Sequence, residues 1–215
     1  MKRVTLFVGH YGSGKSNLAV NYALKLRASG NEVALADMDI VNPYFRSADS
    51  RRELSDAGVR VIALPFANTN VDLPALPSEI YGLVERRDEC AVLDIGGDDR
   101  GALALGRFVP YILAENDYEM LYVVNFYRPL TRTAEEALDV LREIETAAGI
   151  RATGIVNNSN LGPETTAEDV VATLPLVSEL SRFTGLPVVF TSCDERLTVP
   201  NVPHPFPMRL QRKII

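Results

Sequence analysis

The sequence predicts a three-layer α/β domain, in which a mostly parallel, seven-stranded sheet carries helices on both faces. Short apolar runs rich in β-branched residues alternate along the chain with segments whose apolar residues recur at helical spacing. A glycine-rich loop at residues 9–16 separates the first apolar run from the first helical segment. Acidic residues directly follow two of the apolar runs. Such an alternation buries a parallel sheet between helices, and ligands bind beyond the carboxyl ends of its strands.

Seven short strands account for the apolar runs. Each run is bounded by polar or turn-forming residues, as expected for strands buried on both faces. The strands are expected at residues 4–8, 33–36, 59–64, 90–94, 120–125, 153–156 and 187–191.

The helices between these strands have recognisable starts. Asn42 is a suitable N-cap and Pro43 suits the first helical position. Residues 133–136 and 166–169 have the spacing of capping boxes. The irregular segment 65–77 is expected to be a surface loop that contacts a partner. Helices are expected from the glycine-rich loop to residue 30, from 43 to about 57, at 79–87 and 102–108, from 133, from 166, and at 176–183.

Length and composition suit one ordinary domain. The chain has 215 residues, of which 47% are hydrophobic and 23% charged, so we treat 1–215 as a single domain with 196–215 as a C-terminal tail. A net charge of −6 offers nothing that attracts nucleic acid. No apolar run suits a signal peptide or a membrane-spanning helix, so a cytoplasmic protein is expected. Cys90 and Cys193 lie far apart in the sequence and outside any C-x-x-C motif, so we expect two reduced thiols.

Residues 9–16, with the sequence GHYGSGKS, fit the phosphate-binding pattern G-x-x-x-x-G-K-[ST]. A glycine-rich turn without a ligand is the alternative, but a strand before the loop and a helix after it favour phosphate binding. Lys15 would reach the β- and γ-phosphates, and the Ser16 hydroxyl would bind Mg²⁺. The predicted nucleotide-binding residues here are Gly9, His10, Gly12, Ser13, Gly14, Lys15, Ser16 and Asn17.

Acids at two strand ends extend this site. Asp94 fits an acid that holds Mg²⁺ directly or through water, and Asp39 would orient the attacking water and assist with the metal. Asp37 would assist or cap the next turn, and an ordinary turn role is the alternative for all three. Gly96 and Gly97 allow close approach to a γ-phosphate and movement when it leaves. The predicted catalytic residues are Lys15, Asp39 and Asp94, and the predicted metal ligands are Ser16, Asp39 and Asp94.

The glycine-rich loop, residues 37–40 (DMDI) and residues 94–97 (DIGG) together resemble the MinD/ParA-type ATPases. That P-loop class also contains the nitrogenase iron protein, the arsenite-pump ATPases and the cobyrinic acid synthases. The resemblance covers about residues 4–191. It implies Mg²⁺-dependent ATP hydrolysis and, often, ATP-dependent dimerisation with the nucleotides at the interface. Asp39 matches the family's water-activating aspartate, and residues 94–97 match its second switch.

One position departs from the family pattern. These ATPases usually carry a signature lysine early in the loop, which reaches the partner subunit's phosphates, and here that position is His10. Histidine is shorter and mostly neutral at pH 7, so it does not supply the same charge. Arg46, Arg100 and Arg128 are candidates to supply it, with a solvated surface arginine as the alternative for each.

The base contact is predicted from the end of the sixth strand. GTPases of the wider class read guanine through N-K-x-D, whereas residues 157–160 are NNSN, without the aspartate. A side-chain amide suits adenine, so we predict ATP, with Asn157 or Asn158 contacting the base. An ordinary turn role is the alternative for Asn157. Ser192 and Asp194 are expected to complete the pocket.

Two functions remain open at this stage. One is an ATPase switch that acts on an unidentified protein partner, in positioning or in delivery of a metal or cofactor. The other is a P-loop small-molecule kinase or an ATP-dependent ligase of the cobyrinic acid synthase type. Asn68, Asn70, Asp72 and Arg128 would serve its substrate, although their spacing does not require this.

The C-terminal tail carries a weaker signal. As a helix, residues 208–215 would separate basic from apolar side chains, as membrane-binding tails do. Two turns are marginal even when bound, so a tail packed on the domain is the prediction, and membrane binding is not expected. A lone His204 does not suggest a metal site.

Overall fold

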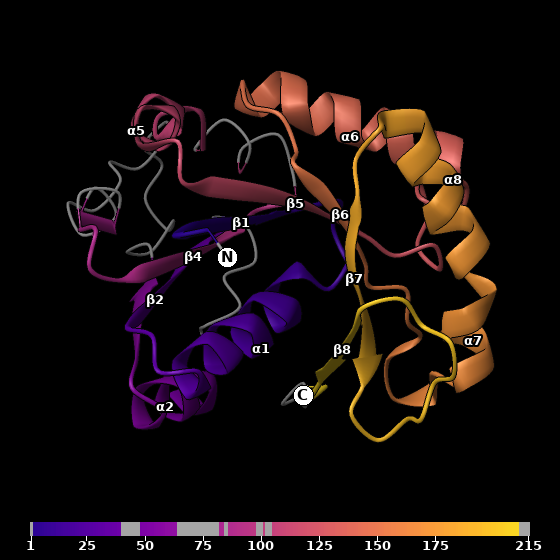
Figure 1. The fold of residues 1–215 in the computed structure, drawn as a ribbon, viewed down its shortest axis with the longest axis horizontal. Helices are drawn as coiled ribbons and strands as arrows, with labels where there is room; N and C mark the ends of the chain where they lie inside the picture. The colour runs from indigo at the N-terminus through magenta and orange to yellow at the C-terminus, as the bar shows by residue number, and fades with distance from the viewer. Residues whose placement is uncertain are drawn as a thin grey trace.

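One eight-stranded sheet runs through the middle of the molecule (Figure 1). The computed structural model describes residues 2–39, 48–63, 82–83, 86–97, 101 and 105–210. Within these residues the strand order is β3-β2-β4-β1-β5-β6-β7-β8, and every neighbouring pair is parallel. The strands are β1 Val4–Val8, β2 Val33–Met38, β3 Val59–Ala63, β4 Cys90–Ile95, β5 Tyr118–Val124, β6 Gly154–Asn157, β7 Val188–Asp194 and β8 Pro205–Met208.

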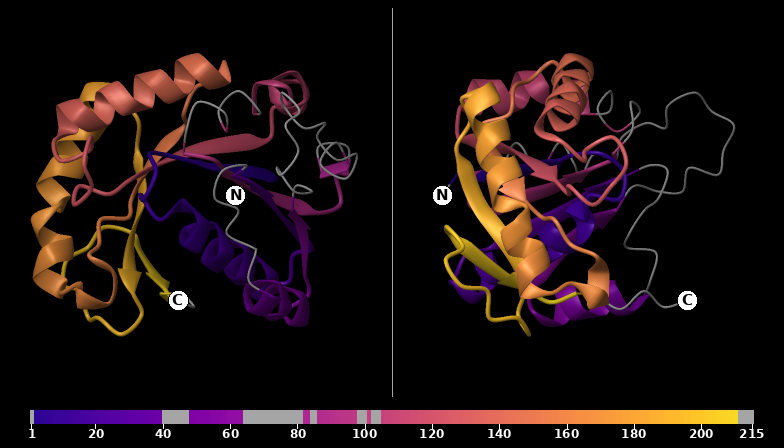
Figure 2. Two further views of the ribbon diagram at one scale, coloured as in Figure 1. Left: turned by 180° about the vertical axis from the view of Figure 1, so that it is seen from behind. Right: turned by 90° about the vertical axis from the view of Figure 1, so that its right-hand side faces the viewer.

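Helices cover both faces of the sheet. Figure 2 shows α1 and α2 on one side and α5, α6 and α8 on the other. The described helices are α1 Lys15–Ala28, α2 Ala48–Asp56, α5 Val109–Glu115, α6 Ala134–Ala148, α7 Ala167–Ala172, α8 Leu174–Thr184 and the short 3₁₀ turn η2 Gly162–Glu164.

Each face of the sheet has its own hydrophobic core. On β1, Leu6 packs into the core beneath α5, α6 and α8, whereas Phe7 packs into the core with α1 and α2. This alternation follows from the period-two geometry of a strand. Because β1 is buried on both faces, its carboxyl end is held firmly, and the glycine-rich loop starts from a fixed point.

The seven predicted strands are all present, and the three-layer α/β prediction is confirmed. The predicted number of strands was too low, because β8 lies within the segment expected to be a tail. Helix α5 was not predicted; Pro110 stands in its first turn, where proline is tolerated. The Thr166–Asp169 capping box is complete, but Glu136 accepts from Arg132 N instead of the cap residue's own N–H.

Some predictions fall outside the described residues. These are the helix start at Asn42 and Pro43, the loop at 65–77 with Asn68, Asn70 and Asp72, most of the helix at 79–87, and the end of the tail at 211–215. Within the part of the chain that the structure describes, no helix is both long enough and apolar enough to cross a membrane.

Candidate nucleotide-binding site

The predicted site residues meet at one edge of the sheet. Because every strand pair is parallel, all the carboxyl ends lie at the same edge. The glycine-rich loop leaves β1 between β4 and β5, the strands that pair with β1 on either side. Residues 94–97 leave β4 beside it, and Asp39 follows β2. Residues 9–17, 39 and 94–97 are called the P-loop region below.

The glycine-rich loop is tightly constrained. Gly9 must lack a side chain, because a Cβ there would lie 2.4 Å from the Val123 carbonyl oxygen. Gly14 has φ +87° and is the N-cap of α1, without a side chain that caps the helix. The first turn of α1 contains no acid. The N-terminal amides of α1 and its positive dipole end are therefore available to an anion.

A buried carboxylate stands next to this helix end. Asp94 is fully buried, and neither of its oxygens has a hydrogen-bond partner within the described residues. Burial raises the pKa of Asp94 to about 6, against the attraction of Lys15 and the influence of Ser16, and the Asp39 carboxylate raises it further. Ser16 is close enough to lower this pKa, yet no hydrogen bond of ordinary geometry joins the two side chains. The structure thus brings Lys15, Ser16, Asp39 and Asp94 together.

These groups fit Mg²⁺ as it occurs in nucleotide sites. No three His, Cys, Asp or Glu side chains form a metal-binding cluster in the described ranges. Mg²⁺ beside a nucleotide does not need one, because it takes one or two protein oxygens together with phosphate oxygens and water. The unpartnered oxygens of Asp94 and the Ser16 hydroxyl are donors of this kind. Asp39 is 9% exposed, and its backbone N–H donates to Asp37 Oδ1 at 3.0 Å, so Asp37 caps the turn.

The second glycine segment touches the first. A Cβ on Gly97 would lie 2.8 Å from Lys15 Nζ and 2.8 Å from the backbone nitrogen of Tyr11. Tyr11 itself is 64% exposed at the surface of the loop. His10 Nδ1 lies 3.0 Å from the carbonyl oxygen of Tyr11, so its ring is engaged with the loop itself. Gly97 is therefore in close contact with the glycine-rich loop.

The two predicted base contacts are buried. Asn157 is fully buried, donates to Thr173 Oγ1 at 3.0 Å and accepts from Ser159. Asn158 is also fully buried, donates to the Ser13 carbonyl at 2.7 Å and accepts from the Ser192 hydroxyl. In this structure both amides are used within the protein, and their role as base contacts stays a prediction.

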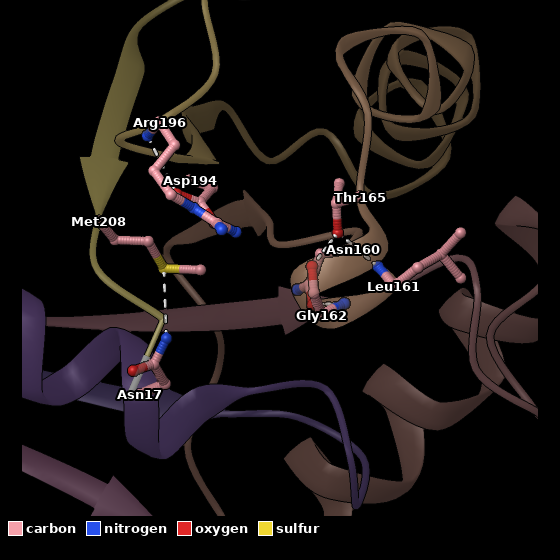
Figure 3. Close-up of polar contacts among 8 residues, drawn as sticks. All are labelled: Asn17, Asn160, Leu161, Gly162, Thr165, Asp194, Arg196 and Met208. Atoms are coloured by element: carbon pink, nitrogen blue, oxygen red, sulfur yellow. Dashed lines mark hydrogen bonds and ion pairs between the residues drawn. The ribbon is translucent and has the colours of Figure 1, made fainter. Parts of the chain in front are cut away.

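A small cavity lies beyond them, and Figure 3 shows side chains on two sides of it. Asn160 and Thr165 stand on one side, and Asp194 and Met208 on the other. The cavity is small, with a volume of about 10 Å³, which is room for about one water molecule. Asn17 Nδ2 contacts Met208 Sδ at 3.8 Å, which links α1 to β8 (Figure 3). The carboxyl ends of β6 and β7, residues 158–165 and β8 are called the β6–β8 region below.

Comparison with known proteins supports the architecture. No family model matches the chain, and no curated protein matches it. Among solved structures, it is similar to the cell division protein FtsY of Thermotoga maritima, with 20% identity and a TM-score of 0.61 over 90% of this chain and 62% of that one. It is also similar to the signal recognition particle receptor FtsY of Elizabethkingia anophelis in complex with GDP, with 16% identity and a TM-score of 0.55 over 90% of this chain and 57% of that one. A third similar structure is the signal recognition particle 54 kDa protein of Aeropyrum pernix, also in complex with GDP, with 18% identity and a TM-score of 0.57 over 88% of this chain and 41% of that one.

This chain has the fold of a P-loop NTPase. It spans between 41% and 62% of the length of those three proteins, and at these identities the similarity concerns the fold alone. They are FtsY and signal recognition particle proteins rather than MinD/ParA proteins, so the family suggested by the motifs is supported only at the level of the P-loop fold.

Sequence reasoning did not anticipate everything at this P-loop NTPase site. The eighth strand brings Met208 to the cavity, and Cys193 also lines it as a free thiol. Among the candidate arginines, Arg128 lies against the loop, whereas Arg46 and Arg100 lie outside the described residues. His204 is exposed, and its carbonyl accepts from Thr191 N at 3.2 Å. A partner distant in sequence gives no local signal for any of these contacts.

Proposed function

We propose that this chain is a Mg²⁺-dependent, ATP-hydrolysing switch with MinD/ParA-like motifs, and that it acts on a protein partner. The observation that supports this most is Asp94, a fully buried carboxylate with both oxygens unpartnered among the described residues. It stands near Lys15 and Ser16 at an uncapped helix N-terminus. A buried group without a partner costs free energy, so its retention indicates a ligand.

Catalysis in this proposal rests on positioning and charge. Lys15 and the loop amides bind the phosphates, Ser16 and Asp94 hold Mg²⁺, and Asp39 orients the attacking water. The bound metal would neutralise charge that develops on the β- and γ-phosphate oxygens. Lys15 is only 5% exposed, and its attraction for an anion is therefore weakly screened.

ATP is the proposed nucleotide, with GTP as its competitor. Recognition of guanine needs a carboxylate that accepts hydrogen bonds from the base, whereas the loop after β6 offers the carboxamide of Asn160. Asp194 also lines the cavity, but its oxygens accept hydrogen bonds from the backbone and guanidinium of Arg196. Two of the similar structures hold GDP, which makes a direct comparison of the two bases necessary.

The switch follows from Gly97. Its closeness to Lys15 Nζ and Tyr11 N means that a γ-phosphate in the loop would compete with, or rearrange, residues 94–97. A change in residues 94–97 would move the adjoining Tyr11, which is exposed, and so alter the surface that a partner meets. The partner is an unidentified protein, and a nucleotide-dependent homodimer is part of the proposal because of the resemblance to MinD/ParA proteins.

Phosphate release by the full chain tests the catalytic part. We expect release from ATP without any added substrate, its loss in EDTA, and weaker binding of GTP in a competition titration. GTP binding tighter than ATP binding would reject the choice of base. Turnover that requires one small carboxylate metabolite would instead favour the ligase.

Light scattering tests the switch. Asp39→Ala should bind ATP without hydrolysing it and so accumulate the ATP-bound state. We expect a dimer with ATP and Mg²⁺ and a monomer with ADP. A monomer under both conditions, with ATP bound, would reject the homodimer.

A further inference from the structure

A second cation reaches the glycine-rich loop from another part of the chain. Arg128 stands in the loop between β5 and α6, and its Cδ and Nε each lie 3.7 Å from the position of a Cβ on Gly12. The arginine stem therefore rests against the loop backbone. Because Gly12 has no side chain and φ +79°, the backbone is open to this approach.

The loop that carries Arg128 is firmly held. The Arg128 N–H donates to the Asn125 carbonyl at 3.0 Å, and Thr131 Oγ1 donates to the same carbonyl at 2.8 Å. Asn125 is 1% exposed and accepts from Tyr127 N at 3.0 Å through its side chain. Its Nδ2 also donates to the Asn160 carbonyl at 3.2 Å. The backbone of Arg128 is thus fixed beside the loop before any ligand binds.

The position of Gly12 indicates which phosphate Arg128 would meet. Ser13 and Gly14 face Asn158 and the β6–β8 region, since Asn158 bonds the Ser13 carbonyl and would clash with a Cβ on Gly14. Tyr11 faces the opposite way, toward Gly97. Gly12 lies between these two sides of the loop, so Arg128 reaches the part of the loop that would hold the phosphates and not the end where the proposal places the base.

The guanidinium is available for a ligand. Arg128 is exposed and makes no ion pair with an acid in the described part of the chain. A guanidinium presents a planar fork that matches phosphate oxygens in a bidentate way. Lys15 supplies one positive charge to a triphosphate that carries several, so a further cation is expected to contribute.

We propose that Arg128 binds the terminal phosphate of the nucleoside triphosphate within its own chain. This inference rests on the proposed function, because it needs a triphosphate in the loop. Arg128 then supplies the positive charge that His10 does not provide, and the ATP-bound state does not depend on a charge from a second subunit. Arg128 then distinguishes triphosphate from diphosphate.

The test compares affinities for ADP and for the non-hydrolysable β,γ-imido analogue of ATP, with the guanine counterparts titrated in parallel. Arg128→Ala should weaken binding of the analogue about tenfold and that of the diphosphate less than about twofold. Arg128→Lys should lie between Arg128→Ala and the wild type, because it keeps the charge and loses the fork. Arg132→Ala, an exposed arginine of the same loop, is the matched control and should change neither affinity.

The outcomes separate this inference from the proposed function. A ratio of triphosphate to diphosphate affinity in Arg128→Ala within twofold of the wild-type ratio overturns the role of Arg128, even if both affinities fall. If the wild-type protein binds these nucleotides but Arg128→Ala has the wild-type ratio of triphosphate to diphosphate affinity, this inference alone is rejected. Wild-type protein that binds none of them rejects the proposed function and this inference together.

Discussion

The P-loop region and the β6–β8 region treat buried polar groups in opposite ways. In the P-loop region, both oxygens of Asp94 and the hydroxyl of Ser13 lack partners among the described residues. In the β6–β8 region, buried side chains have hydrogen-bond partners: Asn158 bonds to the Ser13 carbonyl and to Ser192, and Asp194 bonds to the exposed Arg196. Thr191 Oγ1 is an exception there, since it has no partner in the described ranges.

The difference shows where the molecule reserves interactions for a ligand. An unpartnered buried group lowers stability, whereas a satisfied buried network stiffens its surroundings. The β6–β8 region therefore forms a frame that holds the glycine-rich loop in place, and under the proposed function the P-loop region keeps its unpartnered groups for phosphate and metal. Four substitutions test this contrast.

Lys15→Ala should have the largest effect. Lys15 is 5% exposed and lies near Asp94 and Gly97, so its loss should reduce phosphate release about 10³-fold. Lys2→Ala is the control, because Lys2 is a half-exposed lysine that precedes β1 at the other edge of the sheet. Phosphate release by Lys15→Ala within tenfold of wild type would mean that the P-loop region is not the active site.

Asp94→Asn should stabilise the nucleotide-free protein while it impairs turnover. Burial raises the pKa of Asp94 to about 6 despite the attraction of Lys15, so at pH 7 the side chain is still mostly ionised and its buried charge costs stability. Removing the charge should therefore add about 2 kcal/mol at pH 7. Turnover should fall by about 10–100-fold because a metal ligand is lost. Denaturation in EDTA and phosphate release measure the two effects. A destabilised Asp94→Asn protein would show that this carboxylate is structural, and the contrast between the regions would fail.

The P-loop region could be predicted because its signals are local. Lys15 and Ser16 lie in one motif, and Asp94 stands at the end of an apolar strand. In the β6–β8 region, strands β6 and β7 and the residues Asn158, Ser192 and Asp194 were predicted, but their hydrogen bonds could not be, because the Ser13 carbonyl that Asn158 binds is 145 residues away in the sequence.

Strand β8 was missed for a related reason. Pro205 and Pro207 argue against a strand, but they are exposed and alternate with the buried Phe206 and Met208. As the last strand in the described sheet, β8 pairs only with β7, and an edge strand tolerates proline.

Asn158→Ala should weaken the frame. It removes two buried hydrogen bonds and leaves the Ser192 hydroxyl with only its longer contact, to the Asn157 carbonyl at 3.4 Å, which should cost about 1–2 kcal/mol of stability. Nucleotide affinity should fall as well, because the loop is less firmly held. Asn31→Ala is the matched control, since Asn31 also donates to a carbonyl, that of Leu26, but near the end of α1 remote from the loop. If both variants lose stability and neither loses affinity, Asn158 does not position the loop.

Asp194→Asn should have the smallest effect, and it should depend on pH. Hydrogen bonds from Arg196 lower the pKa of Asp194 against the opposing effect of burial. A lowered pKa contributes stability above the unfolded-state value, near pH 4, and this stability is lost as the pH falls through the folded-state value. The Arg196 side chain is 63% exposed, so solvent screening limits the contribution to about 1 kcal/mol or less. Urea denaturation should therefore show a small loss in Asp194→Asn at pH 7 and a smaller one near pH 3. An equal loss at both values would mean that the charge is unimportant. A loss of GTP affinity much larger than the loss of stability would mean instead that Asp194 reads a guanine, and the β6–β8 region would then also reserve a polar group for the ligand.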